Sequence, residues 1–200
     1  NIREHCSWVH AKEKEEATAK AKDIVRMSVA RTSLLQPLQE IELPVNKAVL
    51  VIGGGVAGMT SALCMAEQGF DVTLVERDAD LGGMARRLHT TLEGTDVQAF
   101  LGELTRKVYR HPSIKVATGS TIKEVTGYVG NFTTRVHSGR SAEGRTREIR
   151  HGAVIIATGA EEHRPTEYLY GEDERVVTLL ELEGRIARKE AAVTNARSMV

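Results

Sequence analysis

Cysteine is scarce in this chain, with only 2 among 200 residues. Cys6 and Cys64 lie far apart in the sequence, and neither belongs to a Cys-x-x-Cys pair. A small fold held together by disulfides is therefore excluded, and these residues alone cannot complete an iron–sulfur centre that needs four thiolates. Such sparse cysteine usage is typical of a reducing compartment, so we expect a cytoplasmic protein.

Charge of one sign is not in excess either, because 27 basic residues balance 27 acidic residues. Nucleic acids and anionic membrane surfaces attract proteins through strong positive charge, so we expect neither as the main partner. Long apolar runs are lacking as well. The longest nearly apolar stretch, residues 47–60, is interrupted by three glycines and is too short to span a bilayer.

The two ends of the chain favour a fragment of a longer protein. The chain begins at Asn1 rather than Met, and residues 198–200 end it inside a new apolar run. A processed short protein is the alternative. Residues 1–10 hold charged side chains and no apolar segment, so we expect no signal peptide.

The hydrophobic pattern changes near residue 46. Residues 11–33 predict an amphipathic helix, whose apolar positions recur at helical spacing: Ala17, Ala21, Ile24, Val25 and Val29. Pro37 and Pro44 then bracket a linker. We expect an N-terminal helical segment and linker over residues 1–46, followed by an incomplete domain over residues 47–200.

The second region opens with a β-α-β pattern. Residues 48–52 form a continuous apolar run, as in a strand buried on both faces. A glycine-rich turn over 53–58 and a helix over 59–68 follow, and a second strand covers 71–76. So short a unit requires two parallel strands with a right-handed crossover.

The rest of the chain predicts an α/β fold, namely a parallel sheet with an inserted antiparallel β-meander. Residues 95–110 and 178–189 predict helices, the latter with Thr178 as its N-cap. The expected buried strands and meander strands are, in chain order, 114–117, 121–129, 131–137, 146–150 and 153–157.

The glycine motif Gly53-Gly54-Gly55-Val56-Ala57-Gly58 follows a buried strand and opens a helix, which is the context of a dinucleotide-binding turn. Gly53 permits the tight turn, Gly55 lets the backbone approach a diphosphate, and Gly58 lets helix and strand pack closely. The helix N-terminus offers free N–H groups to the phosphates. A glycine-rich turn without a ligand is the alternative.

Glu76 ends the second predicted strand. A carboxylate there accepts hydrogen bonds from ribose hydroxyls and disfavours a 2′-phosphate through charge repulsion. Arg77 offers a neighbouring contact. The alternatives are a solvated acid at the end of a strand and an ordinary surface cation.

Two further segments favour FAD over other dinucleotides. Gly82-Gly83-Met84 follows soon after Glu76, and Ala157-Thr158-Gly159 ends the last buried strand. Both resemble segments of flavoproteins with two dinucleotide-binding domains. In these, the Gly pair runs beside the flavin diphosphate and ribityl chain, and the Ala-Thr-Gly segment crosses beneath the cofactor. The resemblance implies a Rossmann-like FAD-binding domain.

Longer stretches are similar to the FAD-binding iron–sulfur subunit of heterodisulfide reductase, essentially from end to end. They are residues 1–10, 22–27, 53–60, 81–86 and 167–172. The glycine motifs are shared by many flavoproteins, whereas residues 6–10 and 168–172 are more specific. The family consists of iron–sulfur flavoproteins that resemble thioredoxin reductase.

The resemblance implies an electron-transfer subunit in a cytoplasmic complex. Its expected partners are other heterodisulfide reductase subunits, hydrogenase or formate dehydrogenase subunits, and ferredoxin. In methanogenesis such a complex reduces the coenzyme M–coenzyme B disulfide. The [4Fe-4S] clusters of the family are expected outside these residues, and no second glycine motif follows Gly159, so no NAD(P)H site is predicted.

We expect no catalytic side chain, because the flavin itself carries the electrons, and no metal ligand, because Cys6 with His5 and His10 is more simply structural. The expected cofactor contacts are Gly53, Gly55, Val56, Ala57, Gly58, Glu76, Arg77, Gly82, Gly83, Met84, Ile122 (through its backbone, to adenine), Ala157, Thr158 and Gly159. The alternatives are an NAD(P)-dependent dehydrogenase, a thioredoxin-reductase-type oxidoreductase, and a scaffold module without turnover.

Overall fold

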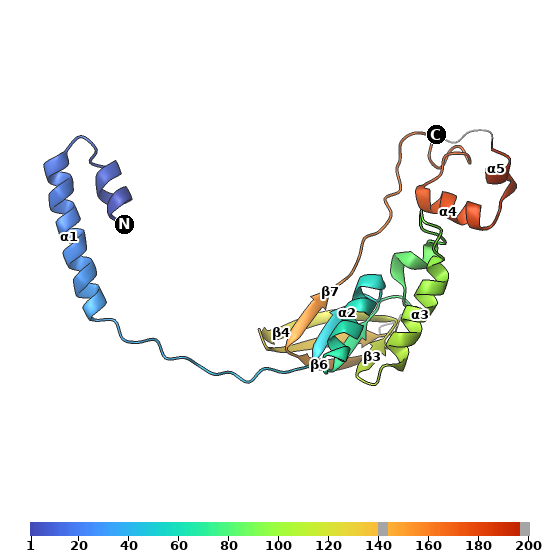
Figure 1. The fold of residues 1–200 in the computed structure, drawn as a ribbon, viewed down its shortest axis with the longest axis horizontal. Coiled ribbons are helices and arrows are strands. Elements are labelled where there is room, and N and C mark those ends of the chain that lie inside the picture. Colours follow the sequence, from blue (N-terminus) through green and yellow to red (C-terminus); the bar gives the residue numbers. More distant parts are fainter. Residues whose placement is uncertain (140–143, 197–200) are drawn as a thin grey trace. The chain divides into compact units, whose positions relative to one another are not determined.

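The computed structural model describes residues 1–139 and 144–196 (Figure 1). The apolar run at 198–200, and part of the polar stretch before the third meander strand, lie outside the described residues. The chain divides into two compact units, Asn1–Leu43 and Pro44–Val200. No helix in the described part of the chain is long and apolar enough to cross a membrane.

The first unit contains a short π-helix, η1 (Arg3–Trp8), and the long helix α1 (Lys14–Ser33). The predicted helix is confirmed. None of its residues is buried, but Ala17, Ala21 and Ile24 of its apolar stripe are half-buried, whereas Val25 and Val29 are exposed. The polar neighbours of Cys6, which include His5 and Ser7, predict a more open thiol than Cys64, but Cys6 is buried in η1.

The second unit is built on a parallel sheet of β1 (Val49–Ile52), β2 (Val72–Val75), β3 (Ile114–Ala117) and β7 (Ala153–Ile156). The strand order is β3-β2-β1-β7, and every neighbouring pair is parallel. The predicted α/β fold is thus confirmed.

Helices α2 (Val56–Glu67) and α3 (Val97–Arg110) cover one face of this sheet (Figure 1). Alternate strand residues such as Val51 and Leu74 join Met59 of α2 and Leu104 of α3 in one apolar cluster. Because side chains alternate between the two faces of a strand, the residues between them point to the other face and need a second cover.

The predicted antiparallel meander supplies that cover. It consists of β4 (Ser120–Tyr128), β5 (Asn131–Ser138) and β6 (Arg145–His151), in the order β4-β5-β6. Leu50 and Val75 of the parallel sheet pack against Val136 of β5 in a second apolar cluster. The parallel strands are therefore covered on both faces, as their continuous apolar sequence requires.

The remaining elements are short. The 3₁₀ turn η2 (Gly83–Arg87) follows β2, and α4 (Leu179–Ala187) and α5 (Ala191–Thr194) end the described chain. Thr178 is the N-cap of α4, as predicted, and forms a reciprocal capping box with Glu181. The side chain of Glu183 accepts hydrogen bonds from the amides of His89 and Thr90, which attaches α4 to the segment after η2.

Cys64 follows Leu63 and precedes Met65, an apolar context that predicts a small buried thiol, and the structure contradicts this expectation. Its side chain is exposed, and Gln68 Nε2 lies 3.4 Å from its sulfur. The face of α2 that packs on the sheet carries Met59, Ala62 and Ala66. Cys64 points elsewhere because two residues turn a helix by more than half a revolution.

Candidate functional site

A cleft of about 980 Å³ opens where β1, β2 and β7 end. This is the edge at which open α/β sheets bind their ligands. The cleft collects residues from the turns after these strands. The predicted contacts that line it are Gly53, Gly55, Val56, Ala57, Glu76, Arg77, Gly82, Gly83, Met84, Ala157, Thr158 and Gly159.

Gly53 and Gly58 fix the glycine loop against its surroundings. Gly53 has φ +106°, and a Cβ there would lie 2.2 Å from the carbonyl oxygen of Ala157. A Cβ on Gly58 would lie 1.8 Å from the carbonyl oxygen of Gly53. Gly58 therefore does not line the cleft but allows α2 to approach the loop behind it.

Gly55 differs from both, because a Cβ there would meet no atom within 4 Å. It is the N-cap of α2 and provides no side-chain hydrogen bond to the first turn. The first intrahelical bond of the loop is donated by the amide of Met59 to the carbonyl of Gly55. The preceding amides of Val56 and Ala57 thus face an open cleft at the positive end of the helix dipole, which suits a diphosphate.

Glu76 lies at the end of β2 and is almost buried, with 7% of its surface exposed. Its Oε2 accepts a hydrogen bond from the amide of Gly54, and its Oε1 accepts one from the amide of Asp78 at 2.8 Å. The carboxylate therefore holds the glycine loop in place while it lines the cleft. The sequence pattern did not reveal this role of Gly54.

The predicted Gly pair packs directly on the glycine loop. The amide of Gly82 donates to the carbonyl of Gly54 at 2.8 Å, and Gly55 and Gly82 form an isolated parallel bridge. A Cβ on Gly83 would lie 3.2 Å from the Cα of Gly55. The two glycine segments thus form one wall of the cleft from backbone alone.

The Ala157–Gly159 segment forms the opposite wall. The amide of Ala157 donates to the carbonyl of Ile52 at 2.8 Å, which continues the β1–β7 pairing beyond the strands. This pairing brings Ala157 against Gly53 and leaves Thr158 and Gly159 at the cleft.

Ion pairs cross the rim of the cleft. Arg77 contacts Glu161 at 2.6 Å, and Arg87 contacts Glu162 at 2.8 Å. The hydrogen bond and charge of Glu161 raise the pKa of Arg77. The pKa of Glu162 is lowered, first by the hydroxyl of Thr178 and further by Arg87.

The sequence prediction missed these rim residues. The complete set of lining residues that it did not include is Asp78, Ala85, Arg86, Arg87, Leu88, Ala160, Glu161, Glu162, His163 and Arg164. The sequence feature that could have identified them is their position, because they lie within a few residues of predicted contact segments.

Ile122 is the other predicted contact that does not line the cleft. It lies on β4 and packs against the second apolar cluster, with Leu50 and Val75. Its backbone contact with adenine stays a prediction.

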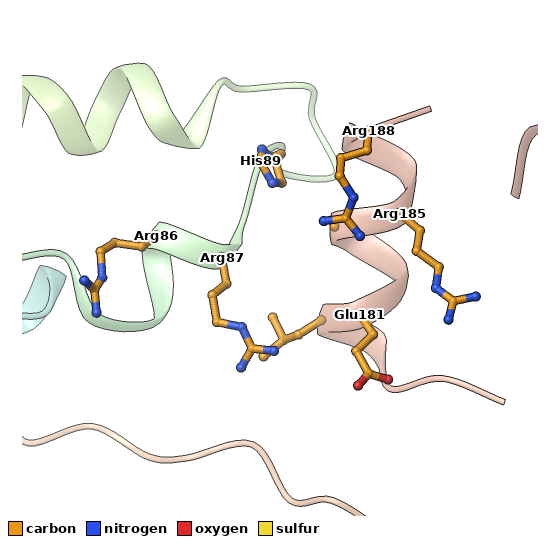
Figure 2. Close-up of a pocket in the computed structure, with 8 residues that line it drawn as sticks. Arg86, Arg87, His89, Glu181, Arg185 and Arg188 are labelled. Carbon is orange, nitrogen blue, oxygen red and sulfur yellow. The ribbon is translucent and has the colours of Figure 1, made fainter. Parts of the chain in front are cut away.

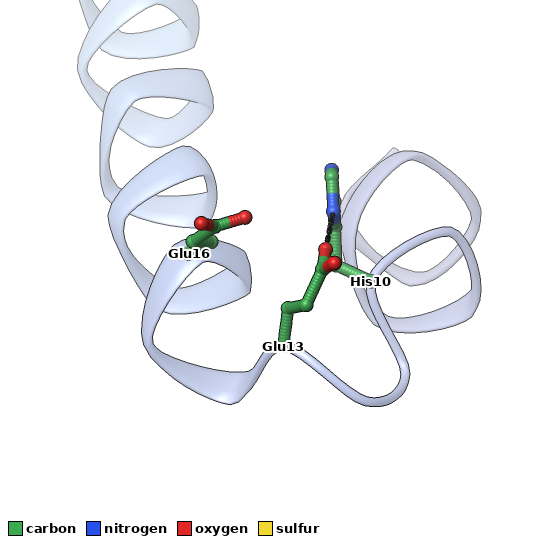
Figure 3. Close-up of side chains that lie close together, drawn as sticks. All are labelled: His10, Glu13 and Glu16. Carbon is green, nitrogen blue, oxygen red and sulfur yellow. Dashed lines mark hydrogen bonds and ion pairs between the residues drawn. The ribbon is translucent and has the colours of Figure 1, made fainter.

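A separate group of possible metal ligands lies in the first unit. The ligand atoms of His10, Glu13 and Glu16 all lie within 4.8 Å of one another (Figure 3). His10 Nδ1 is 3.0 Å from Glu13, and the ammonium of Lys20 is 3.2 Å from His10 Nε2. A cation of the chain thus already lies beside this group, and both glutamates are exposed.

Comparison with known proteins finds curated relatives, solved structures and a family model that match this chain. The curated relatives include a CoB–CoM heterodisulfide reductase iron-sulfur subunit of Methanopyrus kandleri, which is 47% identical over 68% of this chain and 21% of that protein. They also include the corresponding subunit of the H(2):CoB-CoM heterodisulfide,ferredoxin reductase of Methanothermobacter marburgensis, 43% identical over 68% of this chain and 21% of that protein. The chain spans about a fifth of the length of these relatives.

Among solved structures, L-proline dehydrogenase from P. horikoshii is 27% identical, with a TM-score of 0.49, over 63% of this chain and 25% of that one. The predicted resemblance to the iron–sulfur flavoprotein of heterodisulfide reductase is confirmed by the curated relatives. The family model described as pyridine nucleotide-disulphide oxidoreductase matches residues 47–198. Because this match covers well over half of the 200 residues, the chain belongs to the pyridine nucleotide-disulphide oxidoreductase family and carries an oxidoreductase domain.

Proposed function

We propose that residues 47–200 are an incomplete FAD-binding domain and that the cleft at the ends of β1, β2 and β7 holds the cofactor. The observation that carries this proposal is the open space at Gly55. Gly53, Gly54 and Gly58 are packed too tightly to accept a Cβ, whereas Gly55 leaves the first amides of α2 facing a cleft of about 980 Å³. That combination fits a diphosphate held by backbone N–H groups.

The other proposed contacts with FAD follow from the residues that line the rest of the cleft. Glu76 binds the ribose on the adenosine side with the lone pairs that its two backbone hydrogen bonds leave free. Arg77 is a neighbour on that side. Gly82, Gly83 and Met84 line the ribityl side, and Thr158 with Gly159 closes the opposite wall.

FAD, when bound, supplies the chemistry of accepting and releasing electrons. The residues of this chain bind and orient it. Residues 53–55 and 82–83 are glycines and offer the cofactor a surface of backbone atoms without side chains. The Glu76 carboxylate holds the glycine loop in place by accepting a hydrogen bond from the amide of Gly54. In this proposal, no side chain of the cleft among the described residues forms a covalent bond with the substrate or the cofactor.

We further propose that the chain works as an electron-transfer flavoprotein in a heterodisulfide reductase-like complex. The relatives' names support this proposal, since they specify CoB–CoM heterodisulfide and ferredoxin. The proposed electron path runs from the flavin to [4Fe-4S] centres outside these residues and on to a disulfide. The proposed partners are other reductase subunits, hydrogenase or formate dehydrogenase subunits, and ferredoxin, in the cytoplasm.

The test is reconstitution of the full chain with FAD, followed by removal of free ligand and measurement of the visible absorption spectrum. Retained flavin bands in the wild type, and their loss in Gly55→Ala, support the proposal. Retention of NADH but not FAD would instead support a nicotinamide-dependent dehydrogenase. Photoreduction of bound FAD, with reoxidation by ferredoxin or a disulfide, separates an electron carrier from a scaffold.

A further inference from the structure

A second pocket, of about 470 Å³, lies between η2 and α4 (Figure 2). Its size is within the range of small-molecule sites. It shares only Arg86 and Arg87 with the cofactor cleft, and none of the glycine-loop residues borders it. Its lining residues are Arg86, Arg87, His89, Leu180, Glu181, Gly184, Arg185 and Arg188.

The lining is strongly basic, although the chain as a whole has no net charge. Glu181 is the one acid among the lining residues, and both of its carboxylate oxygens are engaged. Oε2 accepts from the amide of Thr178 at 2.9 Å, and Oε1 accepts from the hydroxyl of Tyr170 at 2.8 Å. Glu181 is therefore engaged in capping α4 and makes no ion pair with the lining arginines. Each of these arginines has a carboxylate partner outside the lining: Asp78 for Arg86, Glu162 for Arg87, and Glu190 for both Arg185 and Arg188.

Two guanidinium groups reach into the pocket from opposite walls. Arg87 extends from η2, and Arg188 extends from the end of α4, with the ring of His89 nearby (Figure 2). The guanidinium groups of Arg86 and Arg185 lie on the outer sides of the two walls (Figure 2). The donors that can act on one ligand are thus those of Arg87, Arg188 and His89.

Gly184 makes room for one of these donors. A Cβ on Gly184 would lie 3.3 Å from Nη1 of Arg188, so the guanidinium folds back over the glycine. Glycine inside a helix is less favourable than alanine. Its presence in α4 lets this guanidinium lie close against the helix backbone.

Most N–H donors of these two arginines have no acceptor among the described residues. Arg188 donates through Nε to Glu190 at 2.8 Å, and Arg87 donates through Nη2 to Glu162 at 2.8 Å. A guanidinium carries five N–H donors. Both terminal amino groups of Arg188, and Nε and Nη1 of Arg87, make no hydrogen bond within residues 1–139 and 144–196.

We infer that this pocket binds an oxyanion group, of the phosphate class, on a small ligand other than the diphosphate of the cofactor. Guanidinium groups present paired N–H donors that match phosphate and carboxylate oxygens. Here they approach from two elements far apart in the sequence, so a single tetrahedral anion can bridge η2 and α4. The pocket adjoins the cofactor cleft through Arg87, which places such a ligand beside the redox site proposed above.

The experiment is isothermal titration calorimetry, which measures the affinity of the full chain for inorganic phosphate at low ionic strength. Wild type is expected to bind, and Arg188→Gln is expected to bind at least about tenfold more weakly, because it loses charge-assisted hydrogen bonds. Arg188→Lys keeps the charge without the paired donors and should fall between them. Arg175→Gln, an exposed arginine outside the pocket, should bind like wild type.

Three outcomes would overturn the inference. They are no phosphate binding by wild type, equal binding by wild type and Arg188→Gln, and displacement of phosphate by saturating FAD. The last would show that phosphate had occupied the cofactor's own site. The comparison of wild type with Arg188→Gln measures phosphate binding without any cofactor. If the protein failed to bind FAD, this comparison would still be valid, so the two proposals can be rejected independently.

Discussion

Three consecutive glycines at 53–55 meet three different surroundings. Gly53 faces the backbone of Ala157, Gly54 faces the side chains of Leu81 and Glu76, and Gly55 faces open space. A motif that looks like one glycine run therefore has two positions that are packed against the protein and one, Gly55, at which we propose that a ligand binds. Substitutions can separate these roles.

Gly55→Ala is expected to fold normally and to lose FAD. Gly55 has φ −72°, so alanine is not strained there, and stability should stay within about 0.5 kcal/mol of wild type. The new methyl group would occupy the proposed position of the diphosphate and should weaken FAD binding at least about tenfold. Urea denaturation and FAD titration measure the two effects.

Two matched variants bracket this result. Gly53→Ala combines positive φ with a 2.2 Å contact and should destabilise the domain by about 2 kcal/mol or more. Gly102→Ala, within α3 and with open space at its Cβ, should leave FAD binding unchanged. Tight FAD binding by Gly55→Ala would contradict the proposed position of the diphosphate.

Glu76→Gln is expected to destabilise the apo domain as well as weaken FAD binding. Both carboxylate oxygens accept hydrogen bonds from backbone amides, so the NH₂ group of glutamine must face a donor. An unsatisfied buried donor costs about 1–3 kcal/mol. Urea denaturation without FAD measures this, with the exposed Glu103→Gln as control. Unchanged apo stability would show that Glu76 does not hold the loop.

At the scale of the elements, the β6–β7 connection depends on a buried histidine. His151 ends β6 and is fully buried, and its ring is stacked on Phe132. Its Nδ1–H donates to the carbonyl of Ala153 at 3.1 Å, and Nε2 accepts from the hydroxyl of Thr134 at 2.7 Å. These contacts fix the start of β7, which leads to the Ala157–Gly159 wall of the cleft.

This histidine predicts a loss of stability in mild acid. Burial lowers the pKa of His151, so the folded state binds a proton less readily than the unfolded state. Stability contributed by the neutral ring is fully present above about pH 6.5, and falls as the pH drops through the lowered pKa of the folded state.

Urea denaturation at about pH 8 and about pH 5.5 should show a smaller loss in His151→Gln than in wild type. The exposed His5→Gln serves as control. Equal pH dependence in wild type and His151→Gln would rule out this histidine as the cause.

At the scale of the whole molecule, two compact units are joined by an exposed segment. Residues 35–43 form neither helix nor strand, and Leu38 and Ile41 are almost fully exposed. Such backbone is open to proteases because no hydrogen bonding or packing protects it.

Limited proteolysis should therefore cut first within residues 35–43. FAD at about 100 times its dissociation constant should stabilise the second unit by about 2.7 kcal/mol and slow its later digestion, without protecting the linker. Mass spectrometry of timed samples identifies the cuts. A first cut inside residues 47–139 would contradict the division into units, and equal digestion rates with and without FAD would contradict the proposed site.

The order of elements was predictable because it depends on local patterns. The continuous apolar strands, the glycine turn after β1 and the Thr178 N-cap are each specified within a few residues. The α/β fold with its antiparallel meander followed from them. Local signals together with the resemblance to flavoproteins gave the predicted cofactor contacts, and all of these except Gly58 and Ile122 line the cleft.

The contacts that bind distant segments together were decided only by the tertiary structure. Gly54 and Glu76 are 22 positions apart, and Arg77 and Glu161 are 84 apart. Whether these residues come into contact depends on the strand order and on the paths of the turns. Neither can be derived from the local hydrophobic periodicity of the sequence. The burial of Cys6, the exposure of Cys64 and the basic pocket between η2 and α4 were decided in the same way, because each depends on which surfaces pack together.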